Sequence, residues 1–130
     1  MTHWSLWLGI ALGGALGALA RAACLWAAEA VTAQGNATEK AAARYGLLVA
    51  NTLGCFGIGL LVGGVSSLPE WLFHSLAVGV CGSLTTFSTL CAQWVQQARE
   101  SAGVPKALIQ LGLNLAFGYA ALSAGLAVGA

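Results

Sequence analysis

The sequence predicts an all-α membrane protein that forms a single domain over residues 1–130 and crosses the bilayer four times. Hydrophobic residues make up 58% of the chain and charged residues only 7%, whereas a soluble domain carries about 25% charged residues. Four segments also reach the length of about 20 apolar residues that a helix needs to cross the hydrocarbon. The net charge is +1 without any basic stripe, which argues against nucleic acid as a partner.

The four predicted spans cover residues 4–28, 45–65, 71–95 and 105–130. The connections between them hold seven of the nine charged residues, and the other two are Arg21 in the first span and Lys106 in the first turn of the fourth. Tryptophans fall near the predicted span ends, as an interfacial aromatic belt requires; they are Trp4, Trp7, Trp26, Trp71 and Trp94. No Lys or Arg precedes the first apolar stretch, so we expect a retained span rather than a cleaved signal peptide. Pro105 suits the first turn of the fourth helix.

Glycine placement predicts how the helices pack. Gly9, Gly13 and Gly17 repeat every fourth residue, as do Gly59 and Gly63, and such small faces let membrane helices approach closely. Four helices enclose little interior, so we expect an oligomer. The cysteines stand singly in apolar segments, which predicts small buried thiols rather than a disulfide or metal site.

The charges predict an orientation. Lys40, Arg44, Arg99 and Lys106 all fall in or beside the connections on one side of the membrane. The positive-inside rule then places both chain termini outside. The acidic residues lie in the connections as well, so no carboxylate is expected within a span.

Polar residues at membrane depth are expensive and mark functional positions. Five hydroxyls occur in the eight residues GSLTTFST at 82–89, within the third span. Either they bond back to carbonyls one turn earlier in an unbroken helix, or the helix is broken there. We favour the break because the hydroxyls are five in number, follow Gly79 and Gly82, and include three β-branched threonines. Irregular backbone at that depth is tolerated where it is buried in protein or lines a cavity. Elsewhere the spans hold Arg21, Asn51, Gln93 and the pair Gln110 and Asn114, which share one helical face. Apart from Arg21, these residues are neutral and rich in donors, and no span holds an Asp or Glu, which favours a passive path for an anion over a proton relay or a cation pump.

Three motifs are GGALGALAR at 13–21, VANTLGCFGIGLL at 49–61 and GVCGSLTTFST at 79–89. Together they make the chain resemble the Fluc (CrcB) family of fluoride channels over nearly its whole length. The resemblance implies a dual-topology antiparallel dimer with the third helix broken at its middle. It also implies a multi-pass protein of the plasma (inner) membrane that is not an enzyme. Two fluoride pores would run along the dimer interface, and lipid would surround it.

The resemblance assigns roles to residues of this chain. Backbone carbonyls of Gly82 and Thr85 from both subunits would hold one structural sodium ion (Na+). The fluoride path would include Asn51, Phe87, Ser88, Thr89, Gln110, Asn114 and Arg21, the last near a vestibule. An amide can donate to the ion, and an aromatic ring can present its electropositive edge.

Three positions depart from the family pattern: Ala22 and Leu90 stand where aromatic residues are usual, and Gln93 where an acid is common. Leu90 has no electropositive edge, so one step of the path should be weaker. The departures and the one-sided charges keep two alternatives open. In the first, the chain is one subunit of a heterodimeric channel and has a degenerate pore. In the second, it is a membrane subunit that does not conduct. A four-helix multidrug exporter is disfavoured because it needs a coupling carboxylate within a span.

Overall fold

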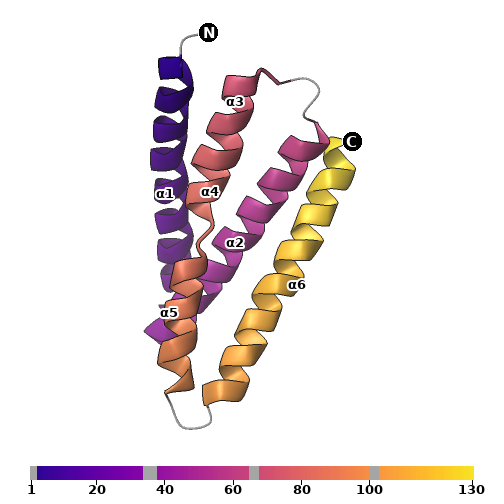
Figure 1. Ribbon diagram of the computed structural model, residues 1–130. Coiled ribbons are helices and arrows are strands. Elements are labelled where there is room, and N and C mark those ends of the chain that lie inside the picture. The colour runs from indigo at the N-terminus through magenta and orange to yellow at the C-terminus, as the bar shows by residue number, and fades with distance from the viewer. Residues whose placement is uncertain (1–2, 34–37, 65–67, 100–102) are drawn as a thin grey trace.

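The computed structural model describes residues 3–33, 38–64, 68–99 and 103–130, and within these ranges every regular element is a helix (Figure 1). The long helices are α1 (His3–Ala33), α2 (Glu39–Gly63) and α6 (Gly103–Gly129). Between α2 and α6 the chain forms α3 (Glu70–His74), the wider π-helix η2 (Ser75–Cys81), α4 (Gly82–Leu84) and α5 (Phe87–Ala98).

Four helices in the described ranges are long and apolar enough to cross a membrane, which confirms that prediction. They cover Trp4–Ala33, Glu39–Gly63, Glu70–Ala98 and Gly103–Gly129. The connections are shorter than predicted: α1 continues past residue 28 to Ala33, α2 begins at Glu39 and α3 begins at Glu70. The charged residues that therefore lie on helices and not in connections are Glu29, Glu39, Lys40, Arg44 and Glu70. Alanines surround Glu29, and their high helix propensity continues the helix into polar sequence. Glu100, expected in a connection, lies outside the described residues.

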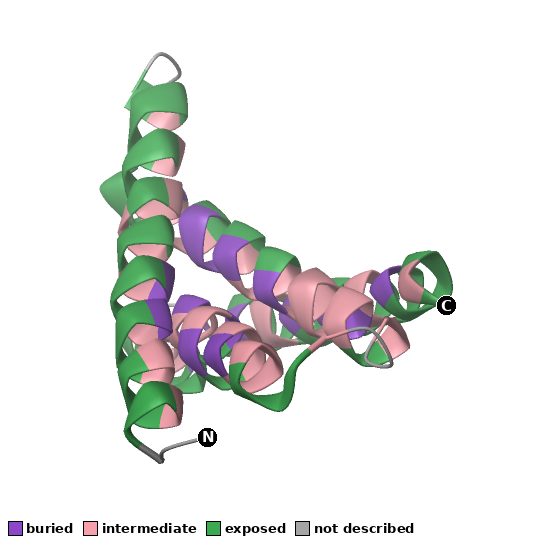
Figure 2. Ribbon diagram, turned by 90° about the horizontal axis from the view of Figure 1, so that it is seen from above, coloured by how far each residue is buried: buried purple, intermediate pink, exposed green. Residues whose placement is uncertain are grey.

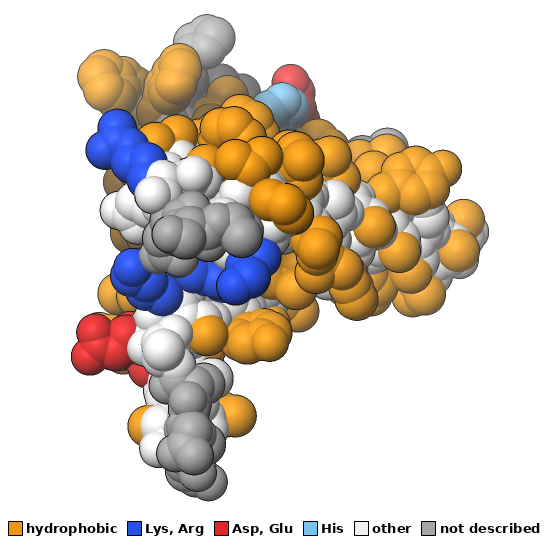
Figure 3. Space-filling model, turned by 90° about the horizontal axis from the view of Figure 1, so that it is seen from below, with side chains coloured by type: hydrophobic (Ala, Val, Ile, Leu, Met, Phe, Trp, Pro, Cys, Tyr) orange, Lys and Arg blue, Asp and Glu red, His pale blue; other side chains and the backbone are white. Residues whose placement is uncertain are grey.

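The helix ends divide the charged residues between two ends of the molecule. Both chain termini lie at the end where α2 finishes and α3 begins (Figure 1). At the other end α2 begins after Thr38, whose side chain accepts a hydrogen bond from the Ala41 N–H at 3.4 Å and so caps the helix. Lys and Arg side chains gather on the face seen from that end (Figure 3).

Glycines bring helix backbones into direct contact, as predicted. A Cβ on Gly13 of α1 would meet the Ser75 carbonyl oxygen of η2. Between α2 and α6, a Cβ on Gly59 would meet the Leu122 carbonyl oxygen, and one on Gly125 would meet the Phe56 carbonyl oxygen. We call this α2–α6 contact the glycine seam, formed by Gly59, Gly63, Gly125 and Gly129. It fixes α6 against α2, and the polar residues of both helices are positioned by it.

The buried interior is narrow, and the outer faces of the helices are exposed and largely apolar (Figures 2 and 3). Leu47 and Ala50 of α2 and Ala107 of α6 are almost fully buried. Many large hydrophobic side chains, among them Leu16 and Leu115, are exposed. A surface of this kind suits lipid or a neighbouring subunit rather than water.

Candidate functional site

Two residues with extended backbone separate α4 from α5. Thr85 has φ −79° and ψ 150°, and Thr86 has φ −151° and ψ 117°. We call Thr85 and Thr86 the extended pair. Thr86 is the N-cap of α5, because its Oγ1 accepts a hydrogen bond from the Thr89 N–H at 3.3 Å. The Thr85 hydroxyl donates to the Cys81 carbonyl at 3.1 Å, which ties the other side of the pair to the preceding turn.

Asn51 of α2 holds the extended pair in place. Its Oδ1 accepts the Thr86 N–H at 2.9 Å, a donor that would bond the Gly82 carbonyl in a continuous helix. One turn further along α2, Gly54 has no side chain, and a Cβ there would meet the Thr85 methyl group. The Asn51 amide bonds the irregular backbone, and Gly54 leaves the space that it occupies on the same face of α2.

The bond from Thr86 also fixes which way the Asn51 amide points. With Oδ1 occupied by a backbone donor, the Asn51 Nδ2 donates to the Asn114 Oδ1 of α6 at 3.1 Å. Asn114 is buried, and its own Nδ2 donates to the Gln110 carbonyl at 3.0 Å. Each of these two amide groups keeps a second N–H without a partner among the described residues, and an N–H group is a donor that an anion can use.

A second pair of amides runs beside the first. Gln93 of α5 donates from Nε2 to the Ala43 carbonyl at 3.3 Å. Its Oε1 accepts from the Gln110 Nε2 at 2.8 Å. The Ala43 carbonyl can only accept, so Gln93 must donate to it and Gln110 must donate to Gln93. A backbone group thus sets the direction of these two hydrogen bonds, as the Thr86 N–H does for the Asn51 amide. We call Asn51, Gln93, Gln110 and Asn114 the amide network.

The hydroxyls beyond the extended pair form a small cluster at the start of α5. Thr86 Oγ1 lies 3.2 Å from the Ser88 Oγ and 3.1 Å from the Thr89 Oγ1. Phe87 projects outward and is 71% exposed, whereas Leu90 is only 4% exposed. The two positions therefore differ in kind: Phe87 belongs to the outer surface of the chain, and Leu90 to its interior.

The backbone carbonyls of Gly82 and Thr85 lack the N–H donors that they would have in a continuous helix. The Thr86 N–H bonds Asn51 and not Gly82, and the Thr89 N–H bonds the Thr86 hydroxyl and not the Thr85 carbonyl. Gly82 is exposed and Thr85 half-buried. Carbonyl oxygens of this kind are suitable ligands for a hard cation. No group of three or more His, Cys, Asp or Glu residues that could hold a metal occurs in the described ranges.

The structure brings together most of the predicted site residues. Asn51, Asn114 and Gln110 are joined directly, and the hydroxyls of Ser88 and Thr89 reach the network through Thr86. Arg21 is half-buried on α1 and takes part in none of these hydrogen bonds. The predicted burial of the cysteines holds for Cys81 only; Cys91 is exposed, because it lies on the outer face of α5.

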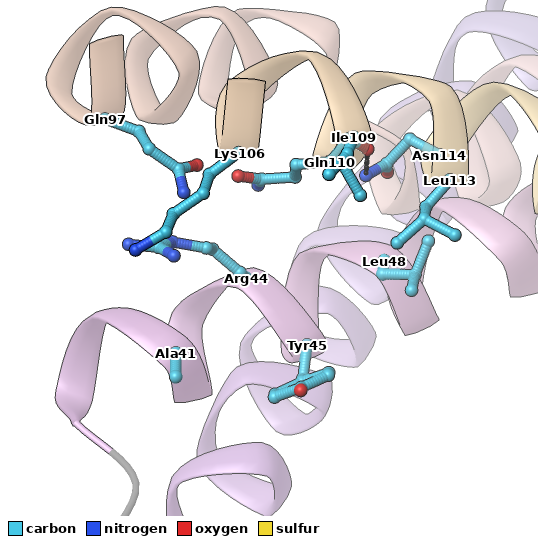
Figure 4. Close-up of a pocket in the computed structure, with 10 residues that line it drawn as sticks. All are labelled: Ala41, Arg44, Tyr45, Leu48, Gln97, Lys106, Ile109, Gln110, Leu113 and Asn114. Atoms are coloured by element: carbon cyan, nitrogen blue, oxygen red, sulfur yellow. Dashed lines mark hydrogen bonds between the residues drawn. The ribbon is translucent and has the colours of Figure 1, made fainter. Parts of the chain in front are cut away.

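Sequence reasoning missed a cavity of about 170 Å³ at the end of the molecule that carries Lys and Arg. Its lining includes Arg44, Gln97, Lys106, Gln110 and Asn114 (Figure 4). We call it the basic pocket. A signal was present in the sequence: Arg44 and Asn51 are seven residues apart, Lys106 and Gln110 four, and Gln93 and Gln97 four, so each pair shares a helical face.

These features define the class of the protein: a multi-pass membrane protein with a neutral, directional amide network between its spans. The chain belongs to the family described as CrcB-like protein, Camphor Resistance (CrcB), which matches residues 8–126. It is 38% identical to the Thermobifida fusca protein named fluoride-specific ion channel FluC 2, over 93% of this chain and 85% of that protein.

Two further relatives carry the name fluoride-specific ion channel FluC. The Deinococcus radiodurans protein is 37% identical over 93% of this chain and 85% of its own length. The Acidobacterium capsulatum protein is 34% identical over 95% of this chain and 94% of its own. The family is thus one of fluoride-specific ion channels, which are not enzymes, and its multi-pass architecture is consistent with the plasma membrane.

Proposed function

We propose that this chain is a passive fluoride channel that lets the anion leave the cell across the plasma membrane. The observation that carries the proposal is the hydrogen bond from the Thr86 N–H to Asn51 Oδ1. It turns the Asn51 amide so that its N–H groups face Asn114 and the space beside it. A small, strongly hydrated anion needs such donors when it leaves water. The names of the relatives support fluoride as that anion.

Selectivity would come from closely spaced hydrogen-bond donors that replace the water shell of a small ion. Asn51 and Asn114 offer amide N–H groups, and Ser88 and Thr89 offer hydroxyls nearby. No carboxylate takes part in the amide network, so an anion meets no fixed negative charge there. A larger halide would fit these closely spaced donors poorly.

The pores themselves require a second subunit. Phe87 is 71% exposed beside the hydroxyl cluster, and a large ring in that position suits a pore wall completed by a partner. We propose an antiparallel, dual-topology homodimer with two pores along its interface. In that arrangement the ring edge of Phe87 would face the ion. Arg21 would lie near a vestibule, away from the amide network.

A heterodimer is the alternative, in which this chain has a fixed orientation and pairs with an oppositely oriented subunit. The gathering of Lys and Arg at one end favours a fixed orientation. Leu90 also favours it, because a leucine has no aromatic ring and Phe87 is then the one ring in the string at 85–90. Relatives with the numbered names FluC 1 and FluC 2 are in keeping with paired chains.

We further propose that the extended pair breaks the third span at mid-membrane and that a structural sodium ion is held there. The freed carbonyls of Gly82 and Thr85 support this, since neutral backbone oxygens suit a hard cation. Two subunits related by antiparallel symmetry would supply both carbonyls twice. The ion would supply positive charge and fix the interface; the chain itself supplies the path.

Fluoride efflux from liposomes that contain only this chain, read with a fluoride electrode, tests the proposal. The wild type should release fluoride and not chloride. Asn51→Asp keeps the acceptor for the Thr86 N–H but replaces the N–H donors with a negative charge, so efflux should cease. Gln96→Glu makes the same chemical change at an exposed position outside the amide network, and it should conduct normally. Folded wild-type protein without efflux contradicts the homodimer, and adding an oppositely oriented subunit then tests the heterodimer.

A further inference from the structure

The basic pocket presents two cations to one cavity. Arg44 comes from α2 and Lys106 from α6, and their side chains extend toward the same side of the pocket (Figure 4). Neither forms a salt bridge with a carboxylate in the part of the chain that the structure describes. Two neighbouring positive charges without a counter-ion attract an anion. The volume of about 170 Å³ leaves room for an ion larger than a halide.

The same pocket also contains hydrogen-bond acceptors that lack donors. Gln97 is 4% exposed, and its Oε1 has no hydrogen-bond partner; the buried Oε1 of Gln110 has none either. Both residues line the pocket. Turning the Gln110 amide over would not help, because its Nε2 must donate to Gln93, which in turn must donate to the Ala43 carbonyl. Buried acceptors left unpaired are costly, which points to a ligand that donates to them.

Few anions satisfy both requirements. Arg44 and Lys106 call for negative charge, and Gln97 and Gln110 call for a hydrogen-bond donor. A halide, nitrate or sulfate at neutral pH has charge but nothing to donate. We propose that the basic pocket binds an oxyanion that retains a hydroxyl group, of the class of hydrogenphosphate and bicarbonate. Its oxygens accept from the two cations, and its hydroxyl donates to the amide oxygens.

An occupant of this pocket lies beside the amide network, because Gln110 and Asn114 belong to both. It therefore covers one end of the path and reduces the passage of a smaller anion from that side. This second effect rests on the proposed fluoride channel, whereas binding of the oxyanion does not. The two can be measured separately.

Isothermal titration calorimetry on the purified, detergent-solubilised full chain measures binding directly. Phosphate is compared with sulfate, a tetrahedral ion without a hydroxyl, and bicarbonate is compared with nitrate, a planar ion without one. Whichever hydroxylated ion fits the pocket should bind at least about tenfold more tightly than its matched partner, the value of one good hydrogen bond. The result for phosphate against that for bicarbonate identifies which of the two is the ligand. Equal binding within both pairs, or no binding at all, overturns the proposal.

Three variants locate the site. Lys106→Gln removes a cation and should weaken all of the ions. Gln97→Met keeps the volume but removes an acceptor, so the hydroxylated ion should lose about tenfold in affinity while its matched partner is unaffected. Arg99→Gln removes a charge at the same end of the molecule but outside the pocket, and it should change nothing. If Arg99→Gln weakens binding of the ions as much as Lys106→Gln does, the attraction is a general effect of charge, and the proposed site is contradicted.

Fluoride efflux with the hydroxylated ion added on the side of the basic pocket tests the block. The rate should fall in the wild type and recover in Gln97→Met. Efflux that is absent altogether contradicts the channel and leaves the calorimetric result standing. Efflux that proceeds unchanged with the ion bound contradicts the block alone.

Discussion

The glycine seam and the extended pair are both points where α2 meets a neighbouring segment, and they are built in opposite ways. At the seam, Gly59 and Gly125 let two regular helices touch backbone to backbone. At the extended pair, the backbone leaves the helix, and the Asn51 side chain supplies the missing hydrogen bond. One contact depends on the absence of side chains and the other on a particular polar group.

The contrast teaches which kind of change each region tolerates. The seam has no room for an added atom, whatever its chemistry, because carbonyl oxygens already occupy the place of a Cβ. The extended pair accepts changes of chemistry only if a hydrogen-bond acceptor remains opposite the Thr86 N–H. The seam is therefore sensitive to volume, and the extended pair to the identity of donors and acceptors.

The largest effect is expected at the seam. Gly59→Val forces a branched side chain against the Leu122 carbonyl oxygen, and overpacking of this kind should cost about 3 kcal/mol or more of the free energy of unfolding. Unfolding in mixed micelles measures it. Gly112→Val is the matched control, because nothing lies within 4 Å of a Cβ at Gly112; a comparable loss there would mean that the seam is not special.

Asn51→Leu should give the next largest loss. It leaves the Thr86 N–H and the Asn114 Oδ1 without their partners, at a cost of about 2 to 3 kcal/mol in the free energy of unfolding. Asn114→Ala leaves the Thr86 N–H bonded to the Asn51 Oδ1, so its loss of stability should be smaller. If both variants unfold alike, Asn51 does not hold the extended pair.

A smaller loss is expected at Gln93. Gln93→Leu removes the acceptor for the Gln110 Nε2 and the donor for the Ala43 carbonyl, which should cost about 1 to 2 kcal/mol in the free energy of unfolding. Gln96→Leu changes an exposed neighbour on the same helix and should have little effect. Unfolding in mixed micelles compares the two, and equal losses would place Gln93 outside any network.

The smallest effect is expected from the N-cap of α5. Thr86→Val keeps the shape of the side chain but removes the Oγ1 that accepts the Thr89 N–H, at a cost of about 1 kcal/mol. Thr86→Ser restores the hydroxyl and should recover most of this free energy of unfolding. A Thr86→Val variant as stable as the wild type would mean that the cap does not matter at this position.

Much of the fold could be predicted because it depends on local features of the sequence. Long apolar runs predict the four helices. Glycines at every fourth residue predict which helix faces pack together. The hydroxyls at 82–89 predict irregular backbone in the stretch where the extended pair lies. In each case a local property of the sequence, namely hydropathy, side-chain size or capping chemistry, determines a local structure.

The amide network and the basic pocket were harder to predict. The sequence marks Gln93 as a departure from the family pattern, but its hydrogen bond with Gln110 depends on how α5 is rotated against α6, which no local pattern predicts. In the sequence, Arg44 and Lys106 indicate only the orientation of the chain, because they stand in or beside the connections. Their convergence on one pocket depends on the glycine seam, because it sets how α2 and α6 align.

The fixed direction of the amide network has a consequence for protons. A proton moves along a hydrogen-bonded chain only if every bond in that chain can reverse its donor and acceptor. Here the Thr86 N–H holds one amide by its oxygen, and the Ala43 carbonyl holds another by its nitrogen, and amide groups do not exchange roles without turning over. A membrane protein with such a network can contain a line of polar groups and still maintain the proton gradient of the cell.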